Sequence, residues 1–173
     1  AVRVGDFVAT PLAVGHSVPG ALAWHLAMPD GTCLVTGDFR DLPDSAALDA
    51  LVAGGLDLLV AESTNAALAT SGPDEDEVAA EIGSLVAKHA TGKILVSCFS
   101  SNLRRIGCCL AAASRAGLPV HVEGEALVAA LAIGREIYRD PLWDPRPAWP
   151  GTGGEGPALI LASGCQGEEG SRL

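Results

Sequence analysis

The second part of this chain alternates short apolar segments with longer segments of helical character. Apolar runs at 93–99, 119–122 and 158–162 are separated by two predicted helices, at 102–116 and 126–138. Repeated strand–helix–strand units with short connections form parallel, right-handed crossovers. The pattern therefore predicts an α/β domain with a layered parallel sheet from about residue 67 onward.

A further helix is predicted just before the first of these strands. Ser71–Asp74 resembles a helix start, and acidic residues at 74–77 lie at the positive end of the helix dipole, where they require no binding partner. Gly92 is expected to end the helix. One apolar face is expected to carry Val78, Ile82, Leu85 and Val86. The Pro- and Gly-rich stretch 140–156 is expected to be a loop.

The first forty residues have the pattern of an antiparallel meander. One strand is expected over 2–14, a second over 21–28 and a third over 32–36, with a hairpin turn at Pro29–Gly31. A short helix capped by Asp44 or Ser45 is expected to reach Val52, and residues 56–61 form a last short strand. Polar residues follow several of these strands.

Three of those polar residues are candidates for chemistry. His16 and Asp38 each stand where a predicted strand runs into a turn, and an imidazole nitrogen with a carboxylate suits Zn²⁺ or Mn²⁺. His16 is equally explained as a turn histidine, and Asp38 as a turn aspartate. Glu62 opens a polar segment after the next strand and is explained either as a functional acid or as part of a loop.

Two further segments are candidates for substrate binding. Ser100, Ser101 and Asn102 are explained as a helix cap, and the same backbone N–H groups suit a phosphate. Arg104 and Arg105 either add a phosphate contact or are solvated surface arginines. Ser163 and Gln166 follow the last predicted strand, either in a plain glycine turn or where ligands bind in open α/β sheets.

Composition narrows the classes of function. A formal net charge of −10 disfavours broad binding to a phosphate backbone, although a narrow cleft in which metal ions supply positive charge remains compatible. The five cysteines include no Cys-x-x-Cys pair, so buried reduced thiols are expected. Because no apolar run is long enough to cross a bilayer, we expect a cytoplasmic protein without membrane contact. A homo-oligomer is compatible with the sequence.

The motifs, taken in order, resemble those of the metallo-β-lactamase/β-CASP nucleases, and within that family the ribonuclease J group. The resemblance rests on "GHSVPG", "TGDF", "ESTNA" and "SGCQGE", which occur in the family's order over nearly the whole chain. It implies part of a metallo-β-lactamase αββα sandwich over 1–66. Residues 67–173 would then be part of a Rossmann-like β-CASP domain with a parallel sheet.

The resemblance also implies roles for residues. His16 would bind one of two Zn²⁺ ions, Asp38 would bridge both, and Glu62 would match an acidic β-CASP motif that is usually Asp in ribonuclease J. The partner would be RNA, gripped by the β-CASP part. The family's His-x-His-x-Asp-His motif and its later β-CASP histidines have no match in this sequence, and His25, His89 and His121 do not stand at their spacing.

We therefore expect a piece of a longer zinc-dependent ribonuclease, inert by itself because two ligands do not hold two ions. One alternative is a degenerate β-CASP protein that binds RNA or a partner without cutting, which the acidic composition fits. Another is a metallo-β-lactamase-fold hydrolase of small esters, against which the strand–helix insertion after Glu62 argues.

Overall fold

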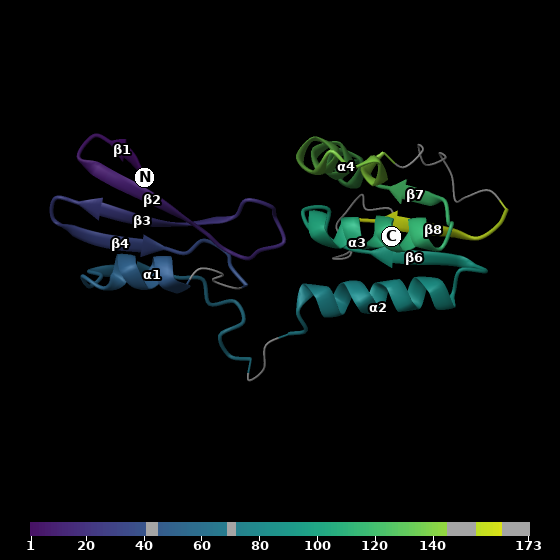
Figure 1. The fold of residues 1–173 in the computed structure, drawn as a ribbon, viewed down its shortest axis with the longest axis horizontal. Coiled ribbons are helices and arrows are strands. Elements are labelled where there is room, and N and C mark those ends of the chain that lie inside the picture. Colours follow the sequence, from purple (N-terminus) through teal and green to yellow (C-terminus); the bar gives the residue numbers. More distant parts are fainter. Residues whose placement is uncertain (41–44, 69–71, 145–154, 164–173) are drawn as a thin grey trace. The chain divides into compact units, whose positions relative to one another are not determined.

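Two sheets of different kinds organise the chain in a computed structural model (Figure 1). The structure describes residues 1–40, 45–68, 72–144 and 155–163. The chain divides into two units, Ala1–Ser71 and Gly72–Leu173. Antiparallel and parallel pairing both occur, so the class is mixed α/β. Among the described residues, none of the helices has the length and apolar character needed to span a membrane.

The first unit is a five-stranded sheet in the order β1-β2-β3-β4-β5. The first four strands pair antiparallel, as predicted, and β5 pairs parallel to β4. Strands β2, β4 and β5 therefore run in the same direction and end at the same edge of the sheet. The strands are β1 Val2–Val4, β2 Phe7–Ala13, β3 Leu22–Met28, β4 Gly31–Val35 and β5 Leu58–Val60.

The prediction of a single strand over residues 2–14 is wrong. Gly5 adopts a φ of +62°, and Val4 pairs with Phe7, so the segment folds into the β1–β2 hairpin. A left-handed residue at this place turns the chain, and glycine adopts that conformation without the steric cost of a Cβ. The predicted hairpin at Pro29–Gly31 is confirmed by pairing of Met28 with Gly31.

One face of this sheet is covered by the helix α1, Ser45–Val52. Val14, Ala23 and Leu34 form the buried centre of this small core. Partly buried side chains around them come from β2, α1 and the neighbouring loops; they are Leu12, Ala21, Phe39, Leu48 and Leu56. The predicted cap Asp44 lies outside the described residues.

The second unit contains a three-stranded sheet in the order β6-β8-β7, formed by Lys93–Ser97, Ala158–Ala162 and Val120–Glu123. Both pairings are parallel, which confirms the predicted parallel sheet. Three helices, α2 Glu75–Lys88, α3 Leu103–Arg115 and α4 Glu125–Tyr138, contribute to one core with this sheet. The register places on one face the strand residues of that core, which are Ile94, Val96, Val120, Val122, Leu159 and Leu161.

The helix α2 begins and packs largely as its sequence predicts. Asp74 accepts hydrogen bonds from the backbone of Asp76 and Glu77, and the Glu77 side chain bonds back to the Asp74 N–H at 3.0 Å, which completes a capping box. Val86 is buried and Ile82 packs against the core. The prediction that Leu85 belongs to the buried face is wrong, because this side chain is 46% exposed.

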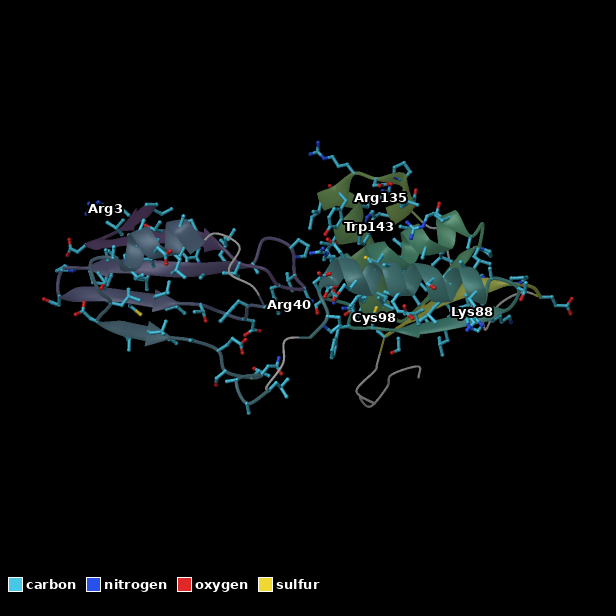
Figure 2. The ribbon with its side chains drawn as sticks, turned by 60° about the horizontal axis from the view of Figure 1, so that its bottom comes forward. Arg3, Arg40, Lys88, Cys98, Arg135 and Trp143 are labelled. Carbon is cyan, nitrogen blue, oxygen red and sulfur yellow. The ribbon has the colours of Figure 1, made fainter. Side chains whose placement is uncertain are left out.

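Residues 140–144 also depart from the expected loop. A 3₁₀ turn, η1, spans Pro141–Trp143 and is capped by the Asp140 carboxylate, which accepts from the Leu142 N–H at 2.9 Å. Trp143 is buried, and Figure 2 shows it beside the helices of the second unit. The Trp143 ring therefore belongs to the core, although the sequence of its segment predicts a loop.

The cysteines that the structure describes are free thiols: Cys33 and Cys109 are buried, Cys98 and Cys108 half-buried. Burial, reinforced by the neighbouring Cys98 and Cys108, raises the pKa of Cys109 to about 12. Burial is also the main cause that raises the pKa of Cys108. A protonated, desolvated thiol is a poor nucleophile, so Cys109 acts as a small apolar core residue.

The raised pKa of Cys109 predicts a loss of stability at high pH. Above pH 9 the unfolded chain loses this proton while the folded chain keeps it until about pH 12, so stability falls with rising pH in that window. The contribution approaches about 1.4 kcal/mol per pH unit. Denaturant unfolding of wild type and Cys109→Ala between pH 8 and pH 11 checks this. We expect a shallower decline for the variant, and parallel curves would contradict the prediction.

Candidate functional site

Three predicted site residues lie at one edge of the five-stranded sheet. His16 follows β2, Asp38 follows β4 and Glu62 follows β5, and these three strands end at the same edge. Figure 1 shows the β2–β3 loop and the chain leaving β4 at this end of the sheet. The topology thus gathers an imidazole and two carboxylates from segments up to 46 residues apart in sequence. Such an edge on a rigid sheet is suited to hold a binding site.

Backbone hydrogen bonds tie the first two of these loops together. The Arg40 N–H donates to the Gly15 carbonyl oxygen at 2.7 Å, and Val14 N–H closes the base of the β2–β3 loop by donating to the Ala21 carbonyl at 3.1 Å. Arg40 is labelled in Figure 2, beyond the end of β4. His16 is next to Gly15, and Asp38 is two residues before Arg40. The histidine and aspartate loops are therefore neighbours.

The second and third loops are joined through Thr36. Its N–H donates to the Val60 carbonyl oxygen at 2.9 Å and extends the parallel pairing by one step beyond the strands. Its hydroxyl oxygen accepts from the Glu62 N–H at 3.2 Å and donates to the Gly37 carbonyl at 2.8 Å. Sequence reasoning did not single out Thr36. The available signal was a hydroxyl residue between the apolar strand β4 and Gly37-Asp38.

The side chains at this edge are accessible. His16 and Asp38 are exposed, and Glu62 is half-buried. The His16 Nε2 lies 3.4 Å from the Ser17 hydroxyl. One Glu62 carboxylate oxygen accepts from the Thr64 N–H at 2.8 Å, which orients the acid through its own loop. The edge thus exposes the imidazole of His16 and the carboxylate of Asp38, while the Glu62 carboxylate is half-buried and held by its own loop.

An imidazole nitrogen and a carboxylate oxygen are donors that zinc accepts. The number of such donors at this edge limits what it can bind. Within the described residues, no cluster of three or more His, Cys, Asp or Glu side chains has the geometry to hold a metal ion. A structural zinc site takes four donors. His16, Asp38 and Glu62 thus do not make a complete metal site within the described residues, and a ligand role for His16 and Asp38 stays a prediction.

The candidate substrate residues of the second unit lie at the carboxyl ends of its parallel strands. Asn102 caps α3 by accepting from the Arg105 N–H at 3.0 Å, so the cap interpretation is confirmed for Asn102. Ser101 is exposed and Ser100 half-buried in the preceding loop. Ser163 follows β8, and its N–H donates to the Glu123 carbonyl at 3.3 Å. Gln166 lies outside the described residues.

Ser163 also packs closely against the start of α4. A Cβ built on Gly124 would lie 2.4 Å from the Ser163 hydroxyl oxygen, and Gly124 has a φ of +107°. Any larger residue would meet both a steric clash and an unfavourable backbone conformation. The ends of β7 and β8 are thus held together by a glycine and a serine. This packing accounts for a serine at position 163 without any substrate. A contact between Ser163 and a substrate stays a prediction.

Arg104 is a surface arginine, with a side chain that is 53% exposed, whereas Arg105 is held in a partly buried ion pair. Arg104 forms an ion pair with Asp76 at 2.8 Å, and Arg105 bonds both carboxylate oxygens of Glu75 at 3.0 and 3.2 Å. Glu75 and Asp76 of the acidic run thus bind arginines of the same unit. These pairs join the first turns of α2 and α3. The two arginines are engaged within the protein instead of lying free for phosphate.

The chain is similar to known proteins both in sequence and in fold. No protein-family model matches the chain. Ribonuclease J of Mycobacterium tuberculosis is 36% identical over 143 residues, covering 78% of this chain and 25% of that protein. Ribonuclease J of Thermus thermophilus is 30% identical over 182 residues, covering 96% of this chain and 31% of that protein.

A solved structure shares the fold. It is described as the crystal structure of a protein of unknown function from Enterococcus faecalis V583. The TM-score is 0.63 at 17% sequence identity, and the match covers 94% of this chain and 42% of that chain. At this identity the likeness concerns the fold alone. It shows that both units of this chain have counterparts in one larger solved chain.

Ribonuclease J of Mycolicibacterium smegmatis is also similar, with 34% identity over 141 residues, covering 77% of this chain and 25% of that protein. The chain spans about a quarter of the length of these mycobacterial relatives. Their name matches the resemblance predicted from the motifs around His16, Asp38 and Glu62. The resemblance is therefore confirmed, and this chain is a partial-length relative of ribonuclease J.

Proposed function

We propose that this chain carries one part of the active edge of a zinc-dependent ribonuclease of ribonuclease J type. Residues 1–66 would contribute to a metallo-β-lactamase αββα sandwich, and residues 67–173 to a β-CASP domain that grips RNA. The supporting observation is the shared sheet edge of His16, Asp38 and Glu62, in a chain whose curated relatives are named Ribonuclease J.

Within this proposal each residue has a stated task. His16 would hold one Zn²⁺ through an imidazole nitrogen, and the Asp38 carboxylate would be shared by both ions. When bound, two zinc ions supply a hydroxide near neutral pH and neutralise charge on the phosphodiester. Glu62 orients this edge through its carboxylate and its backbone, which hydrogen-bonds Thr36. The serines that follow β6 and β8 are proposed to contact the RNA strand.

The same geometry supports a second proposal, that residues 1–173 do not cleave RNA by themselves. His16 and Asp38 supply two donors, fewer than one zinc ion takes in a stable protein site. A protein that binds RNA or a partner without cutting is the competing function, and the net charge of −10 favours a role that needs little phosphate contact.

We predict weak, local metal binding and no turnover. In ¹⁵N NMR spectra of residues 1–173, added Mn²⁺ should broaden the amide signals around His16 and Asp38, because a paramagnetic ion relaxes nearby nuclei. Asp38→Ala should abolish that broadening. Asp30→Ala is the matched control, since Asp30 is an exposed aspartate in the hairpin turn at the opposite end of β4.

The outcomes separate the proposals. Stoichiometric zinc by elemental analysis, or RNA cleavage that disappears with Asp38→Ala, would contradict the prediction that residues 1–173 are inert. If the Mn²⁺ broadening persists in Asp38→Ala, Asp38 is not a metal ligand. That result would favour the non-catalytic binding protein. Hydrolysis of a generic ester without RNA cleavage would instead favour a small-ester hydrolase.

A further inference from the structure

Strand β4 carries a threonine at each end, and each hydroxyl connects β4 to the chain next to β5. At the amino end, Thr32 donates its hydroxyl to the Gly55 carbonyl and to an Asp57 carboxylate oxygen, both at 3.2 Å. At the carboxyl end, Thr36 bonds Glu62 and Gly37. Both hydroxyls therefore form hydrogen bonds to residues next to β5, but the two threonines lie at opposite edges of the sheet. Only the Thr36 end carries the proposed active residues.

The Thr36 hydroxyl forms a continuous hydrogen-bonded connection between the two acidic loops. It accepts a hydrogen bond from the Glu62 N–H at 3.2 Å and donates one to the Gly37 carbonyl oxygen at 2.8 Å. The next residue along the chain is Asp38. Each bond in such a chain polarises the other and strengthens it. The connection therefore links the Glu62 backbone to the peptide that precedes Asp38.

Burial gives this connection its strength. Thr36 is 4% exposed, in an edge where His16 and Asp38 are exposed. Water has little access to the Thr36 hydroxyl, so removing it leaves the Glu62 N–H without that acceptor in a shielded place. Gly37 follows with a φ of +60°, a conformation that lets the chain turn directly after the strand and present Asp38 at the edge.

We propose that Thr36 is a positioning residue that couples the orientation of Asp38 to that of Glu62. It acts through the backbone of both loops and touches neither substrate nor metal. The inference rests on the proposed function, because the consequence of the coupling is a matched placement of the bridging carboxylate and its neighbouring acid. A placement error of about 0.5 Å or more at such a site impairs function.

Three variants of the 173-residue protein test the proposal. Thr36→Val keeps the shape, the burial and the backbone bond to Val60 while it removes the hydroxyl. Thr36→Ser restores a hydroxyl and should rescue the Thr36→Val defect. Thr32→Val removes the corresponding hydroxyl at the other end of β4 and serves as the matched control for general loosening of the β4–β5 pair.

Two measurements are made on each variant. Mn²⁺ titration followed by amide broadening at Asp38 and Glu62 should give a dissociation constant roughly three- to tenfold higher for Thr36→Val than for wild type. Thr36→Ser and Thr32→Val should stay within about twofold of wild type. Hydrogen exchange of the Glu62 amide should accelerate about tenfold or more in Thr36→Val and little in the other two, because that N–H loses its acceptor.

The result that overturns the inference is an unchanged Mn²⁺ affinity in Thr36→Val, or an equal loss in Thr32→Val. Failure of the proposed function gives a different result: wild type itself shows no broadening at Asp38. Exchange of the Glu62 amide then still tests the connection, since the proposal requires Thr36→Val to accelerate it and Thr32→Val to leave it unchanged.

Discussion

Replacing Trp143 by alanine is expected to lower the free energy of unfolding of the second unit by about 3 to 5 kcal/mol. The indole is 6% exposed and belongs to the core cluster of that unit. It also stacks on the Tyr138 ring, with centroids 4.9 Å apart and planes 16° from parallel. Removing it leaves a cavity that the helices α3 and α4 line. Urea unfolding followed by circular dichroism measures the loss.

Two glycines allow the Trp143 ring to lie where it does. A Cβ on Gly134 of α4 would lie 2.0 Å from the ring, and one on Gly107 of α3 would lie 3.1 Å from it. Gly134→Ala should therefore destabilise by about 1 to 3 kcal/mol through overpacking. In the double variant with Trp143→Ala the added methyl enters the cavity, so the combined loss should be smaller than the sum of the two.

A surface control separates this effect from a general weakening of α4. Ile137 is on the same helix and 50% exposed, so Ile137→Ala should change stability by no more than about 0.5 kcal/mol. An unfolding midpoint of Trp143→Ala within error of wild type would show that η1 is not part of the core. An additive double variant would show that the ring and Gly134 do not share space.

Features that depend on neighbouring residues in sequence were predictable. The capping box of Asp74 and Glu77, the Asn102 cap and the hairpin after Met28 each involve residues within three positions of one another. The parallel sheet was equally predictable, because strand–helix–strand order with short connections leaves few alternatives. Gly5 was missed because the alternating residues around it continue on both sides of the turn.

Features that depend on distant partners were not predictable from local pattern. Trp143 lies in a Pro- and Gly-rich stretch, and its burial follows from gaps that Gly107 and Gly134 leave in two helices. The Thr36 hydroxyl meets Glu62, 26 residues later in the chain. By contrast, the edge that gathers His16, Asp38 and Glu62 follows from strand direction, so the motifs were sufficient to nominate all three.

Two arginine ion pairs join α2 to α3, and they differ in burial. Glu75→Ala is expected to lower the free energy of unfolding by about 2 kcal/mol, because it leaves the partly buried Arg105 guanidinium without this carboxylate. The Glu75 and Arg105 side chains are 17% and 30% exposed and meet through two bonds. Chemical denaturation followed by circular dichroism checks the change.

Asp76→Ala is the matched control. Asp76 is also in the first turn of α2 and also binds an arginine at hydrogen-bond distance, so both variants lose the same favourable interaction with the helix dipole. Asp76 is 91% exposed and its partner Arg104 is 53% exposed. Water and salt screen such a pair, and its loss should cost at most about 0.5 kcal/mol.

The thiol of Cys108 reports on the same contact independently of stability. Burial raises its pKa, Arg104 lowers it, and Glu75 raises it further. Glu75→Ala should therefore lower the pKa of Cys108 and speed its alkylation by iodoacetamide near pH 8, since the thiolate is the reactive form. If Glu75→Ala costs no more than Asp76→Ala and leaves this rate unchanged, the Arg105 pair is as weak as a surface pair. Arg105 would then be available to a phosphate, and the substrate contacts proposed near Asn102 would extend to it.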